Sequence, residues 1–147
     1  MKRKSVLILC TGNSCRSQMA EAILKSFAPE LDVFSAGTEP SESVHPKAVE
    51  VMQEIGIDIR AAKPTSVSAF IDQPFDAVVT VCSHAKETCP IFTGCVQSRY
   101  HIGFDDPATF QGTESEITNE FRRVRDEIFA QFKKFYQTTL DVGTQSC

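Results

Sequence analysis

The residues best suited to chemistry form one short run, Cys10-Thr11-Gly12-Asn13-Ser14-Cys15-Arg16-Ser17. The residues before it, Ser5 to Leu9, are β-branched or aliphatic, and those after it repeat with helical spacing. A loop that leads from a strand end into a helix start directs successive backbone N–H groups inward and binds anions. The Arg16 guanidinium adds a planar fork of donors that matches a tetrahedral oxyanion. The run therefore predicts an oxyanion site.

The same surroundings make Cys10 a candidate nucleophile. A free thiol with a pKa near 8.5 is only about 3% thiolate at pH 7, and positive surroundings at a helix start lower this pKa to roughly 3.5–7.5. Ser17 can donate to the thiolate, and the Asn13 side chain can hold the loop through backbone hydrogen bonds. Taken singly, Cys10 could be a small buried residue and Arg16 a solvated cap. No Gly-Lys-Ser/Thr follows, so a nucleotide-binding loop of that type is excluded.

Two further cysteines and an aspartate pair are the next candidates. Cys82 directly follows the apolar run Phe75 to Val81, so in a parallel sheet it would lie at the same edge as Cys10. Asp105-Asp106-Pro107 could supply a general acid, although Asp-Pro is also an ordinary turn signal. From the residues alone, Cys82 could equally be a core residue and Cys89 a passive surface thiol.

The elements that must position these residues alternate between strand and helix. We expect strands at Ser5–Leu9, Asp32–Ala36, Phe75–Val81 and Tyr100–Phe104, and helices from the N-cap Ser17 to before Pro29, at Pro46–Ile55, around Ser66–Ile71 and at Ser115–Tyr136. This order predicts a single-domain α/β protein with a four-stranded parallel sheet flanked by helices. The domain should span residues 1–137, and residues 138–147 should form a frayed tail.

Composition narrows the classes of protein further. The chain has 147 residues, 41% of them hydrophobic, and a formal net charge of -4 at pH 7. We therefore expect one domain and no nucleic-acid partner. No apolar run reaches the 18 or so residues of a membrane span, and the run after Met-Lys-Arg-Lys is too short for a signal peptide. A cytoplasmic protein without a membrane partner is expected, in which the six cysteines would be catalytic, metal-binding or inert.

One family resemblance joins these observations. The string from Cys10 through Glu21 resembles the phosphate loop of the low-molecular-weight tyrosine phosphatase superfamily, and in full it is similar to the arsenate reductase branch. The resemblance extends over about Val6 to Tyr136. Further matching stretches are Ser35-Ala36-Gly37, His45-Pro46-Lys47-Ala48, Asp76 to Cys82, Cys89-Pro90, Phe104 to Ala108 and Phe121 to Ile128. It implies the low-molecular-weight phosphatase-like fold.

The resemblance also implies roles for the candidate residues. Cys10 is the nucleophile, Asp106 is the acid with Asp105 as the fallback, and an arsenate or phosphate-like oxyanion is the ligand. The substrate-binding residues are Thr11, Gly12, Asn13, Ser14, Cys15, Arg16 and Ser17. After arsenate binds covalently to Cys10, a relay of Cys82 and Cys89 would release arsenite and carry the oxidation outward as disulfides.

The resemblance leaves alternatives for the reductant and for the function. Thioredoxin is the favoured reductant, with glutaredoxin plus glutathione as the alternative; no tightly bound cofactor or metal is expected, and the chain should be a monomer. A phosphatase that uses only Cys10, Arg16 and Asp106 is the alternative function. A thiol sensor or metal-binding protein built on Cys82, Cys89 and Cys95 is a third, although no Cys-x2-Cys pair supports it.

Two departures from the family bear on these alternatives. Ala108 follows the Asp-Pro pair where phosphatases usually carry an aromatic residue, which favours a small inorganic substrate. Arg60 to Pro64 replaces a Ser-x-His-x-Ser pattern of the reductases, so a cation-binding role for this segment is not expected.

Overall fold

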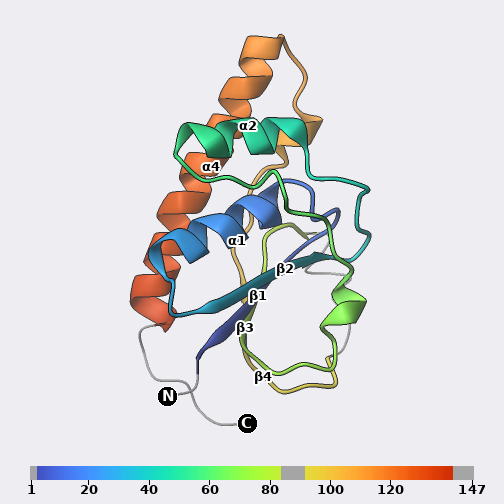
Figure 1. Ribbon diagram of the computed structural model, residues 1–147, viewed down its shortest axis with the longest axis vertical. Coiled ribbons are helices and arrows are strands. Elements are labelled where there is room, and N and C mark those ends of the chain that lie inside the picture. The colour runs from blue at the N-terminus through green and yellow to red at the C-terminus, as the bar shows by residue number, and fades with distance from the viewer. Residues whose placement is uncertain (1–2, 84–91, 141–147) are drawn as a thin grey trace.

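A four-stranded parallel sheet forms the centre of the molecule. Figure 1 shows the computed structural model, which describes residues 3–83 and 92–140. The strands are β1 (Ser5–Cys10), β2 (Asp32–Gly37), β3 (Phe75–Thr80) and β4 (Val96–His101). Their order in the sheet is β2-β1-β3-β4, and every neighbouring pair is parallel. The predicted fold class is confirmed.

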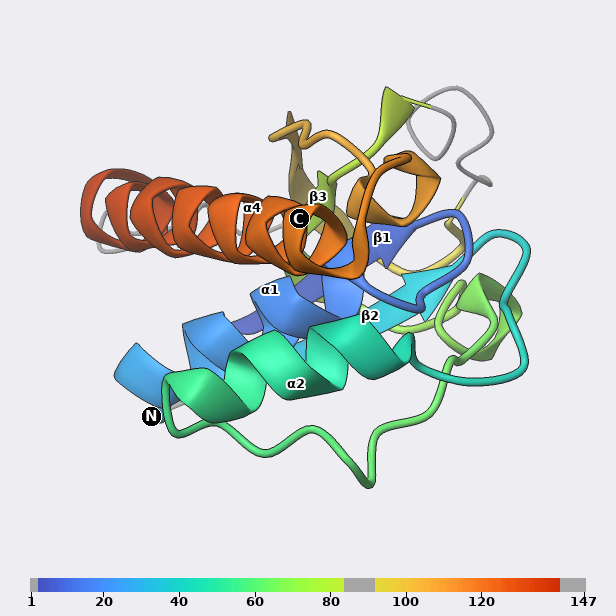
Figure 2. The same ribbon diagram turned by 90° about the horizontal axis from the view of Figure 1, so that it is seen from above.

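Three long helices accompany the sheet. They are α1 (Arg16–Phe27), α2 (Pro46–Glu54) and α4 (Glu114–Phe135), and short turns of helix form at η1 (Val67–Ala69), η2 (Pro107–Thr109) and η3 (Tyr136–Leu140). Helix α1 packs against β1, β2 and α4, and α2 packs against α4, as Figure 2 shows. No helix in the described residues is long and apolar enough to cross a membrane.

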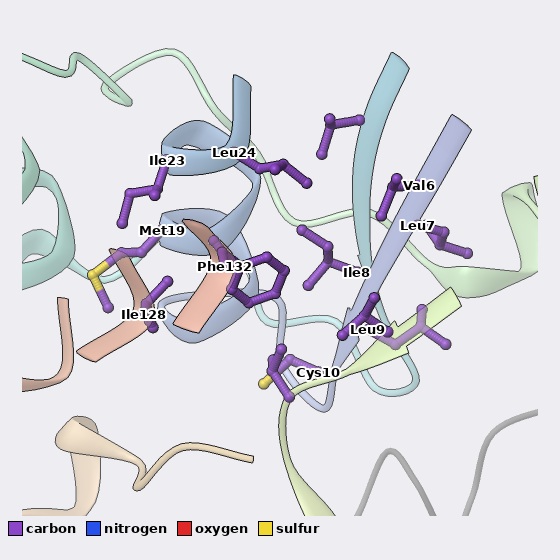
Figure 3. Packing of buried hydrophobic residues seen from close by; sticks show 14 of the residues in the cluster. Val6, Leu7, Ile8, Leu9, Cys10, Met19, Ile23, Leu24, Ile128 and Phe132 are labelled. Atoms are coloured by element: carbon purple, nitrogen blue, oxygen red, sulfur yellow. The ribbon is translucent and has the colours of Figure 1, made fainter. Parts of the chain in front are cut away.

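The core explains why these segments take these forms. Every residue from Val6 to Cys10 is buried, as expected for a parallel strand covered on both faces. Ile8 points toward α1 and Phe132 of α4, whereas Leu7 points the opposite way (Figure 3). Helix α4 begins with a capping box between Thr113 and Glu116, which satisfies two of its free backbone N–H groups.

Two predicted boundaries are wrong. Strand β4 begins at Val96 and ends at His101, instead of spanning Tyr100 to Phe104; its side chains are exposed or half-buried, so no apolar run marks it. Helix α1 begins at Arg16 with Cys15 as its N-cap, and Ser17 lies buried inside the first turn. The described part of the chain ends with η3, and residues 141–147 lie outside it.

Candidate active site

The loop between β1 and α1 is held by a parallel stretch of backbone. We call residues 38–45 the bracing segment. Its N–H groups donate to the carbonyls of the loop in succession: Thr38 to Cys10 (3.1 Å), Glu39 to Thr11 (2.9 Å), Ser41 to Gly12 (2.9 Å) and His45 to Ser14 (2.8 Å). Because these loop carbonyls accept hydrogen bonds from the bracing segment, they point away from the centre of the loop. The N–H groups of the same peptide units point toward the centre, which is the geometry of an anion-binding nest. Within the described residues, the N–H groups of residues 12–15 donate to no backbone carbonyl.

Asn13 is the hub that fixes the shape of this loop. It is fully buried and has a positive φ of 53°, a conformation that Asn tolerates better than most residues. Its Nδ2 donates to Ser17 Oγ (2.7 Å) and Ser35 Oγ (3.0 Å). Its Oδ1 accepts from Thr65 N (2.9 Å) and Gln18 Nε2 (3.1 Å). Of these partners, sequence reasoning missed Thr65; Gln18 and Ser35 stood only within stretches that resemble the family.

The Arg16 side chain extends along one side of the loop. Nη1 donates to the Phe104 carbonyl at 3.2 Å, and Nη2 lies 3.4 Å from Asp106 Oδ2. Nε is buried and has no partner among the described residues. Leaving a buried charged donor without an acceptor is costly. A tetrahedral oxyanion in the loop would supply that acceptor, so the donor set fits the expected ligand.

The two aspartates face different ways. Asp106 Oδ1 lies 3.7 Å from Cys15 Sγ and accepts a hydrogen bond from Ala108 N (3.0 Å), which starts η2 beside the loop. Asp105 is 78% exposed and pairs with Arg123 of α4 at 3.0 Å. Of these two aspartates, Asp106 is therefore the one that lies beside the loop.

The structure brings Cys10 and Cys82 together. Both are buried thiols, and Cys82 Sγ lies 3.3 Å from Thr11 Oγ1. Hydrogen bonding to Cys82 and burial raise the pKa of Cys10 above its ordinary value, although the Arg16 charge lowers it. The prediction that the surroundings lower the pKa of Cys10 is therefore wrong, because the effects of Cys82 and of burial outweigh that of the Arg16 charge. Burial and the Asp106 charge raise the pKa of Cys15 to about 11.

Replacing Cys82 with alanine should make Cys10 a stronger acid. The largest cause of its raised pKa disappears, so the pKa of Cys10 should fall. A fall of one unit increases the thiolate fraction about tenfold, and alkylation of Cys10 by iodoacetamide near neutral pH should accelerate at least that much. Peptide mapping after timed alkylation measures the rate at Cys10 separately. The matched control is Cys147→Ala; an alkylation profile unchanged by Cys82→Ala would contradict the assignment.

Cys89 and Cys147 lie outside the described residues. Cys95, which only the thiol-sensor or metal-binding alternative uses, is disulfide-bonded. In residues 3–83 and 92–140, no three His, Cys, Asp or Glu side chains are grouped to hold a metal ion.

Comparison with known proteins places this fold and site in a class. The family described as low molecular weight phosphotyrosine protein phosphatase matches residues 5–145. The chain belongs to this family.

Within this family, the chain is similar to arsenate reductases. The chain is 48% identical to an arsenate reductase of Halalkalibacterium halodurans over 139 residues, which cover 94% of this chain and 99% of the relative. It is 46% identical to an arsenate reductase of Bacillus subtilis with the same coverage. Among solved structures, an arsenate reductase in the phosphate-binding state is similar, with a TM-score of 0.75 and 31% identity, covering 91% of this chain and 97% of that one.

Proposed function

We propose that this protein reduces arsenate to arsenite through a covalent adduct on Cys10 and a disulfide relay of Cys10, Cys82 and Cys89. The observation that carries the proposal is the pairing of the buried Cys82 and Cys10 thiols at one edge of the sheet. A phosphatase has no need of a second thiol beside its nucleophile. The similarity to arsenate reductases over nearly the whole chain supports the same reading.

The first step forms the adduct. The loop N–H groups and Arg16 hold the arsenate oxygens, and the Cys10 sulfur attacks arsenic(V) while its proton passes to an arsenate oxygen, which becomes a hydroxyl group. A sulfur–arsenic bond forms and the bond between arsenic and that hydroxyl breaks. Asp106 gives its proton to the departing hydroxyl, which leaves as water.

The second step carries the redox change. Cys82 Sγ attacks Cys10 Sγ and a disulfide forms between them. The sulfur–arsenic bond breaks, and its electron pair reduces arsenic(V) to arsenic(III), which leaves as arsenite. Thr11 Oγ1, 3.3 Å from Cys82 Sγ, can donate to the attacking sulfur and favour its thiolate form.

The remaining steps restore the thiols. Cys89 attacks Cys82, which frees Cys10 and leaves a Cys82–Cys89 disulfide. An external dithiol of the thioredoxin type then reduces this disulfide and is itself oxidised. We favour thioredoxin over glutaredoxin with glutathione because the relay ends in an intramolecular disulfide that a dithiol can exchange with directly.

Single turnover on arsenate tests the relay. Cys89→Ser should release about one arsenite per protein and stop with a Cys10–Cys82 disulfide, whereas Cys82→Ser should release none with a dithiol reductant. Arsenite is counted by chromatography, and the disulfide is located by mass spectrometry after blocking free thiols. Cys147→Ser, which removes a thiol that the relay does not use, is the matched control and should turn over repeatedly. Repeated turnover by Cys89→Ser would contradict the relay.

The phosphatase alternative has a different signature. It predicts no arsenite, no Cys10–Cys82 disulfide, and hydrolysis of phosphate esters that is unaffected in Cys82→Ser and Cys89→Ser. Supplying thioredoxin and glutaredoxin in separate reactions identifies the reductant. Arsenite formed repeatedly with neither present would overturn the relay.

A further inference from the structure

His45 contacts three parts of the molecule: the oxyanion loop, helix α2 and helix α4. Its backbone N–H ends the bracing segment by donating to the Ser14 carbonyl at 2.8 Å. Its side chain is the N-cap of α2, where Nδ1 accepts a hydrogen bond from Lys47 N at 3.1 Å. The imidazole also lies against the buried Phe121 ring of α4, with centroids 4.8 Å apart.

We propose that His45 is a positioning residue for the oxyanion loop: its backbone N–H holds the Ser14 end of the loop while its neutral imidazole caps α2 and packs against α4, and protonation releases this cap. The inference concerns binding of any tetrahedral oxyanion. It therefore stands apart from the proposed reductase activity.

The hydrogen bond to Nδ1 fixes the state of the ring. An imidazole nitrogen that accepts a hydrogen bond carries no proton, so the neutral ring must hold its proton on Nε2. In the protonated ring both nitrogens are donors, and Nδ1–H would face Lys47 N–H. A positive charge at the amino end of α2 would also oppose the helix dipole. Protonation and capping are therefore mutually exclusive.

Some groups around the imidazole ring raise the pKa of His45 and others lower it. Burial lowers the pKa of His45 most, the Asp106 carboxylate raises it, and the Lys47 ammonium lowers it, with a net direction below the ordinary 6.5. Lys47 is itself paired with Glu50 of α2 and Glu114 of α4. Asp106 is shared with Arg16 and Cys15 of the loop. The ring is therefore neutral near pH 7 and takes up its proton in mildly acidic solution.

The consequence is a pH dependence of the loop itself. In the unfolded chain His45 has the higher pKa and binds more protons, so the stability that the cap contributes is present above pH 6.5. It is lost as the pH falls through the lower pKa of the folded state. Since the same residue braces Ser14, oxyanion binding should weaken over the same interval.

His45→Asn separates the cap from the titration. Asparagine is an equally good N-cap and its amide does not titrate. We would measure the dissociation constant of inorganic phosphate by calorimetry at several values between about pH 5 and about pH 7.5, a range that includes ordinary histidine titration. Between these limits wild-type affinity should fall about fivefold more than that of His45→Asn, the ratio expected for loss of a typical cap. Protonation of phosphate affects both proteins equally and cancels in this ratio.

Two further measurements complete the test. His45→Ala lacks the cap at every pH, so its affinity should be lower throughout and should show the shallow pH dependence of His45→Asn. Nitrogen chemical shifts of His45 in the wild-type protein report the tautomer even if a variant fails to fold. Equal pH dependence of wild type and His45→Asn, or a proton on Nδ1 in the neutral ring, would overturn the proposal. Loss of arsenite formation alone would count against the relay and leave this inference intact.

Discussion

Arg16→Lys is expected to weaken the binding of inorganic phosphate by about 10–10²-fold, the usual effect of losing a hydrogen bond to a charged group. Arg16 uses its guanidinium in three directions. Nη1 binds the Phe104 carbonyl, Nη2 faces Asp106, and Nε is left for the ligand. A lysine ammonium keeps the charge but has a single nitrogen, so it cannot hold the loop and the oxyanion together.

Calorimetric titration with phosphate measures this effect without any turnover. Arg122→Lys is the matched control, because Arg122 of α4 pairs with Glu54 at the end of α2 and, among the described residues, forms no hydrogen bond or ion pair with the loop. Phosphate affinity should be unchanged in that variant. If Arg16→Lys also bound phosphate with nearly wild-type affinity, the guanidinium would not be the oxyanion donor that we infer.

The local pattern of the sequence was enough to predict the framework of this site. The run Val6 to Cys10 is apolar throughout and becomes a strand buried on both faces. Once β1 and β3 were expected to be parallel, Cys10 and Cys82 had to share one edge of the sheet. The structure confirms the parallel pairing and places both thiols at that edge.

What the sequence could not predict depends on contacts between distant backbone atoms. The bracing segment acts through its N–H groups, which every residue type except proline possesses, so no residue pattern marks it. The bond between Asn13 and Ser35 joins residues that are 22 apart in the chain. The direction of the Cys10 pKa depends on Cys82, whose hydrogen bond exists only after the sheet has formed. Local periodicity contains none of this information.

Asn13→Ala should reduce the free energy of unfolding by roughly 3–8 kcal/mol and abolish phosphate binding. Alanine cannot reach Ser17, Ser35, Gln18 or Thr65. Ser35 and Gln18 keep other hydrogen bonds, so the Ser17 hydroxyl and the Thr65 N–H are the groups left unsatisfied, at about 1–3 kcal/mol each. Alanine also tolerates the left-handed φ of 53° poorly, which adds about 1–2 kcal/mol. Against a typical total stability of about 5–15 kcal/mol, this loss would be large.

Asn13→Gly separates the two contributions. Glycine adopts a positive φ without steric cost, so this variant loses the side-chain hydrogen bonds but not the backbone conformation. In urea unfolding followed by circular dichroism, Asn13→Gly should be more stable than Asn13→Ala by about 1 kcal/mol. Both variants should bind phosphate poorly, because the loop keeps its nest only while Asn13 joins it to β2 and to Thr65. Wild-type affinity in Asn13→Gly would mean that the positive φ alone shapes the loop and that the hydrogen-bonded hub contributes only to stability.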